Sequence, residues 1–329
     1  MELRTEHLTP VRFREGFGPR FLVTVDVEEE FDWSQPLARE NVSVESVARL
    51  RKFQRFCEAV EVRPCYLIDF PVANSRIAQD ILGKAFKAGK ADLGLQLHPW
   101  VTPPHREEVN QSNSFPGNLP PALERDKIAT LTRKVRDSFD TDALIYRAGR
   151  YGLGEDTASL LAEQGIAIDS SVRAYHDYSA AGGPDFGMVD PNPFWLDRDH
   201  RVMEIPLTTV FAGVFARSGA SGFRRIEKVP RLPGLAARLG LLERIPLTPE
   251  GTTVQEALRG IDIALRQDVP ILNLAFHSPS LVPGNTPYVR DSTDLDAFYD
   301  WWRAVFDHLK ARNVRPTGIE EIMAAVELE

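Results

Sequence analysis

Short apolar segments alternate with longer amphipathic segments along most of the chain, and this alternation limits the folds that the chain can adopt. The first apolar segment, residues 20–27, is rich in β-branched residues and ends in a run of acids, as expected of a strand buried on both faces. Residues 44–60 then place apolar side chains every three or four positions, which predicts an amphipathic helix. Repeated strand and helix units predict parallel βαβ connections, enough of them to close or nearly close a barrel.

The same pattern continues toward the C-terminus. Further strands are expected at residues 64–69, 92–97, 143–146, 166–169 and 270–276. Further helices are expected at residues 74–88, 121–138, 155–164, 253–267 and 293–312, with Trp301 and Trp302 as core residues of the last. Residues 208–250, rich in Gly, Pro and Arg, interrupt the pattern and predict an insertion in the C-terminal half with one or two short helices. The whole chain, residues 1–329, is expected to form one α/β domain.

Charge and hydropathy exclude two classes of partner. The formal net charge of -8 argues against nucleic acid, because proteins that bind phosphates usually carry an excess of Lys and Arg. No run of residues reaches the roughly 18 to 20 apolar positions of a membrane span, and the first 20 residues lack the apolar core of a signal peptide. These observations predict a cytoplasmic protein, with Cys57 and Cys65 as buried thiols. They do not indicate an oligomeric state.

Several polar residues fall at or just after the ends of expected strands. They are Asp26, Glu28, His98, Arg147, Asp169 and His277. Because parallel strands end at the same face of a barrel, these residues predict one active site. Asp26 and Glu28 are two positions apart and therefore point to the same side of an extended strand, where one can act as a general base and the other as a metal ligand. A solvated acidic loop is the alternative interpretation.

The remaining candidates have less certain roles. His98 and His105, with a carboxylate, would suit a divalent metal such as Zn²⁺, although His105 lies in an expected loop. Arg147 is placed to hold Asp26, and Arg150 is placed to bind an anionic substrate group. His277 is placed to donate a proton to a leaving amine.

The motifs that contain these residues, taken together, resemble those of the polysaccharide deacetylase superfamily (NodB-homology, carbohydrate esterase 4-like), in particular a WalW-like bacterial branch. The resemblance implies a distorted (β/α) barrel and a hydrolase that removes acetyl groups from an N- or O-acetylated sugar or polysaccharide precursor. The motifs are TVDVEEEFDW at 24–33, LHPWVTPP at 97–104, NSFPGNLP at 113–120, YRAGRYG at 146–152, DSSV at 169–172 and FHSPSLVPGNTPYVR at 276–290.

The resemblance also implies a role for each matched residue. Asp26 corresponds to the catalytic base, Arg147 to the arginine that holds the base, and His277 to the general acid that protonates the departing amine. A divalent metal, Zn²⁺ in the first instance, is expected at Glu28, His98 and His105. Arg150, Trp100 and Tyr151 are expected to bind substrate.

One position departs from the pattern of the superfamily. Close relatives often carry a histidine where this chain carries Gln96, and an amide oxygen is a poor ligand for zinc. Two alternatives to a metal-assisted deacetylase therefore remain. The chain could be a metal-independent amidohydrolase acting on a small C–N substrate, as allantoinase-like members are, or a catalytically silent homologue that binds glycans.

Overall fold

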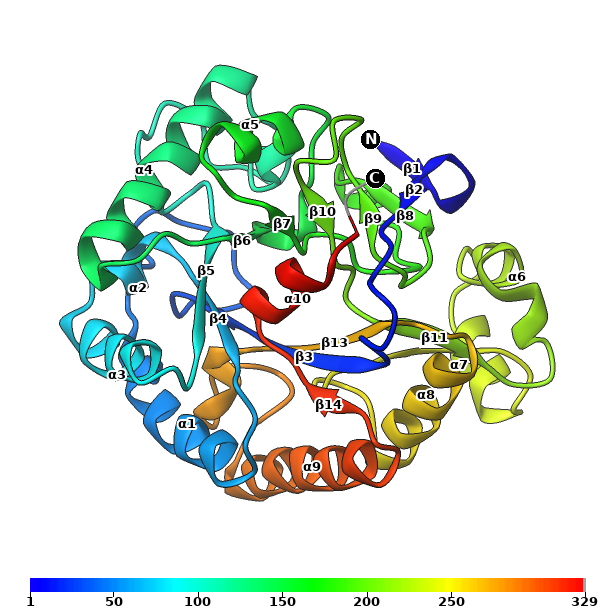
Figure 1. Cartoon of the computed structure of the whole chain (residues 1–329). Coiled ribbons are helices and arrows are strands. Elements are labelled where there is room, and N and C mark those ends of the chain that lie inside the picture. Colours follow the sequence, from blue (N-terminus) through cyan, green and yellow to red (C-terminus); the bar gives the residue numbers. More distant parts are fainter. Residues whose placement is uncertain (328–329) are drawn as a thin grey trace.

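A curled sheet of ten strands forms the centre of the structure, a computed structural model that describes residues 1–327 (Figure 1). Its neighbours are parallel from β13 to β10, and β9 and β2 continue it as antiparallel strands. The order is β13 (Ile271–His277), β3 (Arg20–Val27), β4 (Cys65–Ile68), β5 (Asp92–Leu97), β6 (Ile145–Ala148), β7 (Ile168–Asp169), β10 (Met203–Glu204), β9 (Phe194–Trp195) and β2 (Thr9–Pro10), with β14 (Arg315–Pro316) also beside β3. The predicted α/β class is confirmed, and the sheet forms part of a barrel rather than a closed one.

Helices surround the outside of this sheet, as Figure 1 shows. They are α1 (Leu50–Ala59), α2 (Phe70–Ala73), α3 (Arg76–Lys87), α4 (Pro121–Phe139), α5 (Thr157–Glu163), α8 (Val254–Arg266) and α9 (Ser292–Ala311). Short 3₁₀ helices are η1 (Thr5–His7), η2 (Glu45–Arg49), η3 (Pro116–Asn118), η4 (Gly149–Tyr151), η5 (Ser179–Ala181), η6 (Ala216–Ser218) and η7 (Ser278–Leu281). The alternation read from the sequence is confirmed, and Trp301 and Trp302 are buried in the core as predicted.

Successive side chains along each strand point to opposite faces of the sheet, and this determines where polar groups can lie. On β3, Val23 and Val25 pack outward among the residues that contact the helices, whereas Leu22 packs inward with the residues that fill the barrel. Helix α10 (Ile319–Ala325) contributes Ile319 and Ile322 to that inner cluster and so covers the end of the barrel where β3 begins. Polar side chains on the inner face are therefore concentrated toward the other end, where the strands finish.

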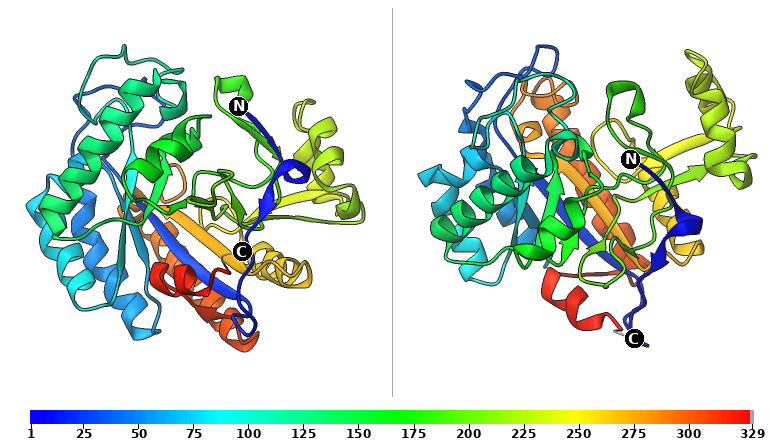
Figure 2. Two further views of the ribbon diagram at one scale, coloured as in Figure 1. Left: turned by 45° about the horizontal axis from the view of Figure 1, so that its top comes forward. Right: turned by 90° about the horizontal axis from the view of Figure 1, so that it is seen from above.

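Some elements were not predicted from the sequence. Strands β1 (Glu2–Arg4) and β8 (Asp185–Met188) form a separate parallel pair, and the short strands β2, β9, β10 and β14 lack a clear pattern of their own. Residues 208–250 contain the expected short helices, α6 (Gly219–Ile226) and α7 (Leu232–Arg238), between two further strands, β11 (Thr209–Ala212) and β12 (Glu243–Pro246). Figure 2 shows α6 and α7 at the periphery of the molecule, away from the barrel helices.

Three expectations from the sequence, which concern the single domain, the insertion and the location in the cell, remain predictions. The single-domain expectation covers residues 1–329, of which the last two lie outside the described range. That residues 208–250 are an insertion remains a prediction. Among residues 1–327 there is no helix with the length and apolar character needed to cross a bilayer, and the cytoplasmic location remains a prediction.

Two buried carboxyl groups face each other across β7 and β10. Asp169 and Glu204 are paired in register and neither is exposed. Asp169 accepts a hydrogen bond from the Ser171 hydroxyl at 2.5 Å, and Glu204 accepts one from the Val172 backbone N–H at 3.0 Å. Burial raises the pKa of Asp169 to about 6 and raises the pKa of Glu204 well above its usual range. We infer that the pair holds at least one proton at neutral pH, because two adjacent buried carboxylates would repel each other.

This pair predicts a pH-dependent stability. A carboxyl group whose pKa is higher in the folded than in the unfolded protein stabilises the fold below its unfolded pKa of about 4, and this contribution is lost as the pH rises through the folded pKa. Glu204→Gln can donate to Asp169 at any pH, so we expect the decrease in unfolding free energy between pH 4.5 and 7 to become smaller by about 1 kcal/mol or more. Urea denaturation of both proteins at the two pH values measures this difference. An unchanged pH dependence would show that the pair does not titrate in this range.

Candidate active site

A cavity of about 690 Å³ lies at the C-terminal ends of the central strands. Of the six residues that the sequence placed at strand ends, Asp169 does not line this cavity, because it is fully buried beside Glu204. The other five, Asp26, Glu28, His98, Arg147 and His277, all line it. They come from β3, β5, β6 and β13 or from the residues just after these strands, and are brought together because these strands run parallel in one sheet.

Asp26 is held by a buried ion pair with Arg147. The Nη1 group of Arg147 donates to Oδ1 of Asp26, and the two residues are 0% and 2% exposed respectively. The other guanidinium groups are also bonded: Nε donates to the Ser170 carbonyl at 2.7 Å, and Nη2 donates to the hydroxyls of Thr24 and Ser170 at 2.9 Å each. The sequence suggested that Arg147 lies just beyond the end of its strand. It lies inside β6 instead, because the strand extends two residues further than expected. The guanidinium is therefore fixed from all sides, and it fixes Asp26.

His277 lies beside Asp26 and has its own carboxylate partner. Its Nε2 atom is 3.6 Å from Oδ2 of Asp26, and its Nδ1 atom is 2.7 Å from Oε2 of Glu250. Glu250 also accepts the backbone N–H of His277 at 3.0 Å and the Ser280 hydroxyl at 2.5 Å. Burial lowers the pKa of His277, but the carboxylates of Glu250 and Glu28 outweigh this effect and raise it to about 10. His277 is therefore an imidazolium at neutral pH, with a proton to donate.

Glu28, Gln96 and His98 form a second polar group in the cavity. Gln96 Nε2 donates to Glu28 Oε2 at 3.3 Å, and His98 Nε2 is 3.6 Å from the same oxygen. Neither Oε1 of Glu28 nor Oε1 of Gln96 has a hydrogen-bond partner within residues 1–327, although both atoms are buried. Burial raises the pKa of Glu28 to about 8 and lowers the pKa of His98. Buried oxygens without a partner are unfavourable. At a pKa of about 8 Glu28 keeps a proton at neutral pH, and a cation bound beside it would take the place of that proton.

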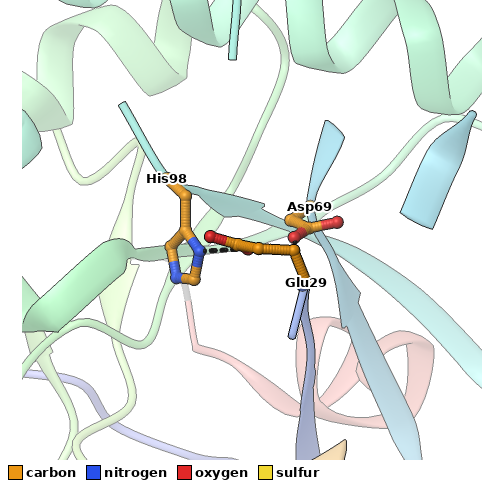
Figure 3. A group of neighbouring side chains, drawn as sticks. All are labelled: Glu29, Asp69 and His98. Atoms are coloured by element: carbon orange, nitrogen blue, oxygen red, sulfur yellow. Dashed lines mark hydrogen bonds and ion pairs between the residues drawn. The ribbon is translucent and has the colours of Figure 1, made fainter. Parts of the chain in front are cut away.

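The other nitrogen of His98 contacts the buried Glu29, which lies beside Asp69 (Figure 3). His98 Nδ1 is 2.7 Å from Glu29 Oε2, and Trp100 Nε1 donates to Glu29 Oε1 at 2.6 Å. Asp69 accepts the backbone N–H groups of Glu29 and Val72 at 2.8 and 2.7 Å. The ligand atoms of Glu29, Asp69 and His98 all lie within 4.8 Å of one another, so by distance this group can hold a metal ion.

The hydrogen bonds favour a different role for Glu29 and Asp69. All four of their carboxylate oxygens already accept a hydrogen bond from the protein, whereas Glu28 has an oxygen without one. A carboxylate that accepts the Nδ1 proton of a histidine leaves the Nε2 lone pair free, which is how such carboxylates orient metal-binding histidines. We therefore interpret Glu29 as the residue that aims His98 Nε2 at Glu28.

The glycine that follows the neighbouring strand β6 allows this histidine its position. A Cβ atom on Gly149 would lie 2.5 Å from the Leu97 carbonyl oxygen and 2.6 Å from Cδ2 of His98, closer than carbon atoms tolerate. The Trp100 ring stacks on the other side of His98 at 4.4 Å between ring centroids. His98 is thus clamped between a glycine and an indole ring.

Of the other expected site residues, some line the cavity and one does not. His105 is exposed on the loop after β5 and does not line the cavity, so the structure does not bring it to Glu28 and His98. Trp100 lines the cavity but is only 2% exposed, and its indole N–H is already bonded to Glu29. Arg150 and Tyr151 both line the cavity and both have left-handed backbones, with φ of 54° and 61°. Such strained backbone is frequent at functional sites.

Sequence reasoning missed four residues of the site. Asp69 and Arg173 follow the strands β4 and β7, so the argument from strand ends could have found them. Glu29 belongs to the acidic run that was singled out, but nothing in the sequence distinguishes it from its neighbours. Glu250 lies in a loop after β12, in a segment without a clear pattern, and only the folded chain brings it to His277.

Comparisons with known proteins bear on the fold. No model of a protein family matches the sequence, and neither does any curated protein. Among solved structures, the chain is similar to PuuE allantoinase at 13% identity and a TM-score of 0.54, covering 94% of this chain and 91% of that one. It is similar to a "probable polysaccharide deacetylase" from Pseudomonas aeruginosa PAO1 at 13% identity and a TM-score of 0.50, with coverage of 94% and 91%. It also resembles a 4-alpha-glucanotransferase from Thermococcus litoralis at 14% identity and a TM-score of 0.52, covering 93% of this chain but 40% of that one. At these identities the likeness shows a shared fold.

Removing the partner of His277 should change the acidity of that residue. In Glu250→Gln we expect the pKa of His277 to decrease from about 10 by at least about one unit, because the nearest opposite charge is lost while burial remains. Titration of the histidine ring by NMR measures this shift, and the exposed substitution Glu155→Gln serves as the control. An unshifted His277 in Glu250→Gln would mean that Glu250 does not keep it protonated.

Proposed function

We propose that this protein is a hydrolase of the polysaccharide deacetylase superfamily that removes an acetyl group from an N-acetylated, or O-acetylated, sugar or polysaccharide precursor. The observation that carries the proposal is the side-by-side placement of Asp26 Oδ2 and His277 Nε2, which are 3.6 Å apart. Each has its own buried partner, Arg147 for Asp26 and Glu250 for His277. A held carboxylate next to a protonated imidazole supplies a general base and a general acid at one point.

The proposed reaction uses these two groups in turn. The separation of 3.6 Å is too long for a strong hydrogen bond, so both Oδ2 of Asp26 and Nε2–H of His277 remain available to a reactant. Asp26 accepts a proton from a water molecule, whose oxygen forms a bond to the acetyl carbon. The C–N bond then breaks, and His277 gives its proton to the departing nitrogen. The products are acetate and a free amine on the sugar.

A divalent cation fits between Glu28 and His98. Two ligands at about 2.0 to 2.1 Å from a tetrahedral zinc ion lie roughly 3.3 to 3.4 Å from each other, which is close to the 3.6 Å between Glu28 Oε2 and His98 Nε2. The free Oε1 atoms of Glu28 and Gln96 supply further acceptors. A bound cation would polarise the scissile carbonyl and stabilise the charge that develops on its oxygen. His105 was expected as the third ligand, but it does not line the cavity, so its position does not support that role.

Gln96 also favours a second candidate. Its amide oxygen is a weak ligand for zinc, so the site has two strong ligands where a structural zinc site has four. The fold is shared with PuuE allantoinase, and the second candidate is a metal-independent amidohydrolase that uses Asp26 and His277 on a small C–N substrate. A silent glycan-binding homologue is a third outcome. The WalW-like branch remains a prediction.

Asp26→Asn should abolish turnover with an intact fold. The amide cannot accept a proton from water, so we expect acetate release from an acetylated chromogenic sugar to decrease by about 10²-fold or more. The exposed substitution Asp137→Asn should behave as the wild type. Circular dichroism establishes that each variant is folded. Turnover retained in Asp26→Asn would exclude this residue as the base.

Metal affinity separates the two possible positions of the cation. We expect Gln96→His to bind Zn²⁺ at least about tenfold more tightly than the wild type by calorimetry, because an imidazole replaces an amide beside Glu28 and His98. Glu28→Gln should weaken binding more than Asp69→Asn does. The opposite order would place the cation at the Glu29, Asp69 and His98 group instead. Acetate release that a chelator does not affect would support the metal-independent candidate.

A further inference from the structure

Two arginines in the cavity have no acidic partner. Arg150 and Arg173 both line the cavity, and neither is joined to a carboxylate by an ion pair anywhere in residues 1–327. Arg147, the third arginine of the lining, differs because Asp26 neutralises it. The cavity therefore contains two uncompensated positive charges that the proposed base and acid do not use.

Arg150 is held in position by contacts that leave its charge uncompensated. Its Nη1 group donates to the Ser114 hydroxyl at 2.5 Å, and its guanidinium lies 4.4 Å from the centre of the Phe115 ring. The residue is half-buried, and desolvation lowers its pKa. Its left-handed backbone, with φ of 54°, is an uncommon conformation for an arginine. The protein thus accepts backbone strain and desolvation to keep this guanidinium at the cavity wall.

Arg173 is held in a similar way from another segment. It follows β7, and its guanidinium lies 5.8 Å from the centre of the Tyr151 ring. Tyr151 in turn stacks on Tyr178 with 5.5 Å between ring centroids, and Tyr178 also lines the cavity. Aromatic faces stabilise a guanidinium without neutralising it. Both arginines therefore keep their affinity for an anion.

An anion would offset the cost of holding these two cations in a partly desolvated cavity. The planar guanidinium offers paired N–H donors that match the two oxygens of a carboxylate or phosphate. The cavity volume of about 690 Å³ lies within the range of small-molecule sites, and both arginines line this cavity together with Asp26.

We propose that Arg150 and Arg173 form an anion subsite, so that the substrate is a sugar carrying a carboxylate or phosphate group near the acetyl group that is removed. This inference rests on the proposed hydrolase for the reaction, but the subsite itself does not. The chemistry common to its ligands is an oxyanion attached to a sugar ring. Uronic acids and sugar phosphates are the two sources to be distinguished.

The test measures binding of three sugars that carry no acetyl group, namely glucose, glucuronate and glucose 1-phosphate. Because none of them can be deacetylated, calorimetry on the unmodified protein reports binding alone. We expect at least one anionic sugar to bind at least tenfold more tightly than glucose, and its affinity to decrease several-fold between 50 and 500 mM NaCl. The preferred anion identifies the source, a uronic acid or a sugar phosphate.

Variants then assign the binding to the two arginines. Arg150→Gln and Arg173→Gln should each weaken binding of the preferred anionic sugar by at least about tenfold and leave glucose binding unchanged. Arg133→Gln, an exposed arginine on α4, is the matched control and should have no effect. The salt and ligand comparisons on the unmodified protein remain decisive if a variant fails to fold.

Equal affinity for charged and neutral sugars, or no measurable binding of either anion, would overturn the subsite. So would an anion preference that survives both arginine substitutions. Acetate release is assayed separately on acetylated sugars, so the two proposals can fail independently. Anion binding without hydrolysis would support the subsite and contradict the proposed hydrolase. Hydrolysis without anion preference would support the hydrolase and contradict the subsite.

Discussion

The buried ion pair between Asp26 and Arg147 is the interaction on which the rest of the site depends. Neither charge could be left alone in the barrel, because removing one partner of a buried pair costs about 3 to 5 kcal/mol. The bonds of Arg147 to Thr24 and Ser170 join β3, β6 and the end of β7 across the interior. The same contacts that stabilise the middle of the barrel therefore orient the carboxylate at its open end.

The site repeats one arrangement, in which each functional group is held by a second residue that need not touch the substrate. Arg147 holds Asp26, Glu250 holds His277, and Glu29 holds His98. Glu250 also keeps His277 protonated, and Glu29 leaves the Nε2 lone pair of His98 free. Such support keeps reactive groups within a few tenths of an ångström of a productive geometry, which rigid strands provide better than loops.

The cavity contains acidic side chains and unpaired basic side chains together. The carboxylates of Asp26 and Glu28 face His98 and His277, and the free oxygens of Glu28 and Gln96 suit a cation. Arg150 and Arg173, which have no acidic partner, suit an anion. A ligand that is neutral where it reacts and negative elsewhere would complement both regions.

The sequence alone determined the longer strands and the helices around the central sheet, because period-two and period-3.6 hydrophobic patterns are local properties. It did not determine the short strands β2, β9, β10 and β14, which lack such a pattern. It also determined that Asp26, Glu28, His98, Arg147 and His277 would meet, since parallel strands end at one face. Tertiary structure decided what those patterns cannot encode: that His105 stays on an exposed loop, and that Glu250 reaches His277 from a loop without a periodic signal. Such long-range contacts depend on how loops pack after the sheet has curled, and no spacing in the chain specifies that.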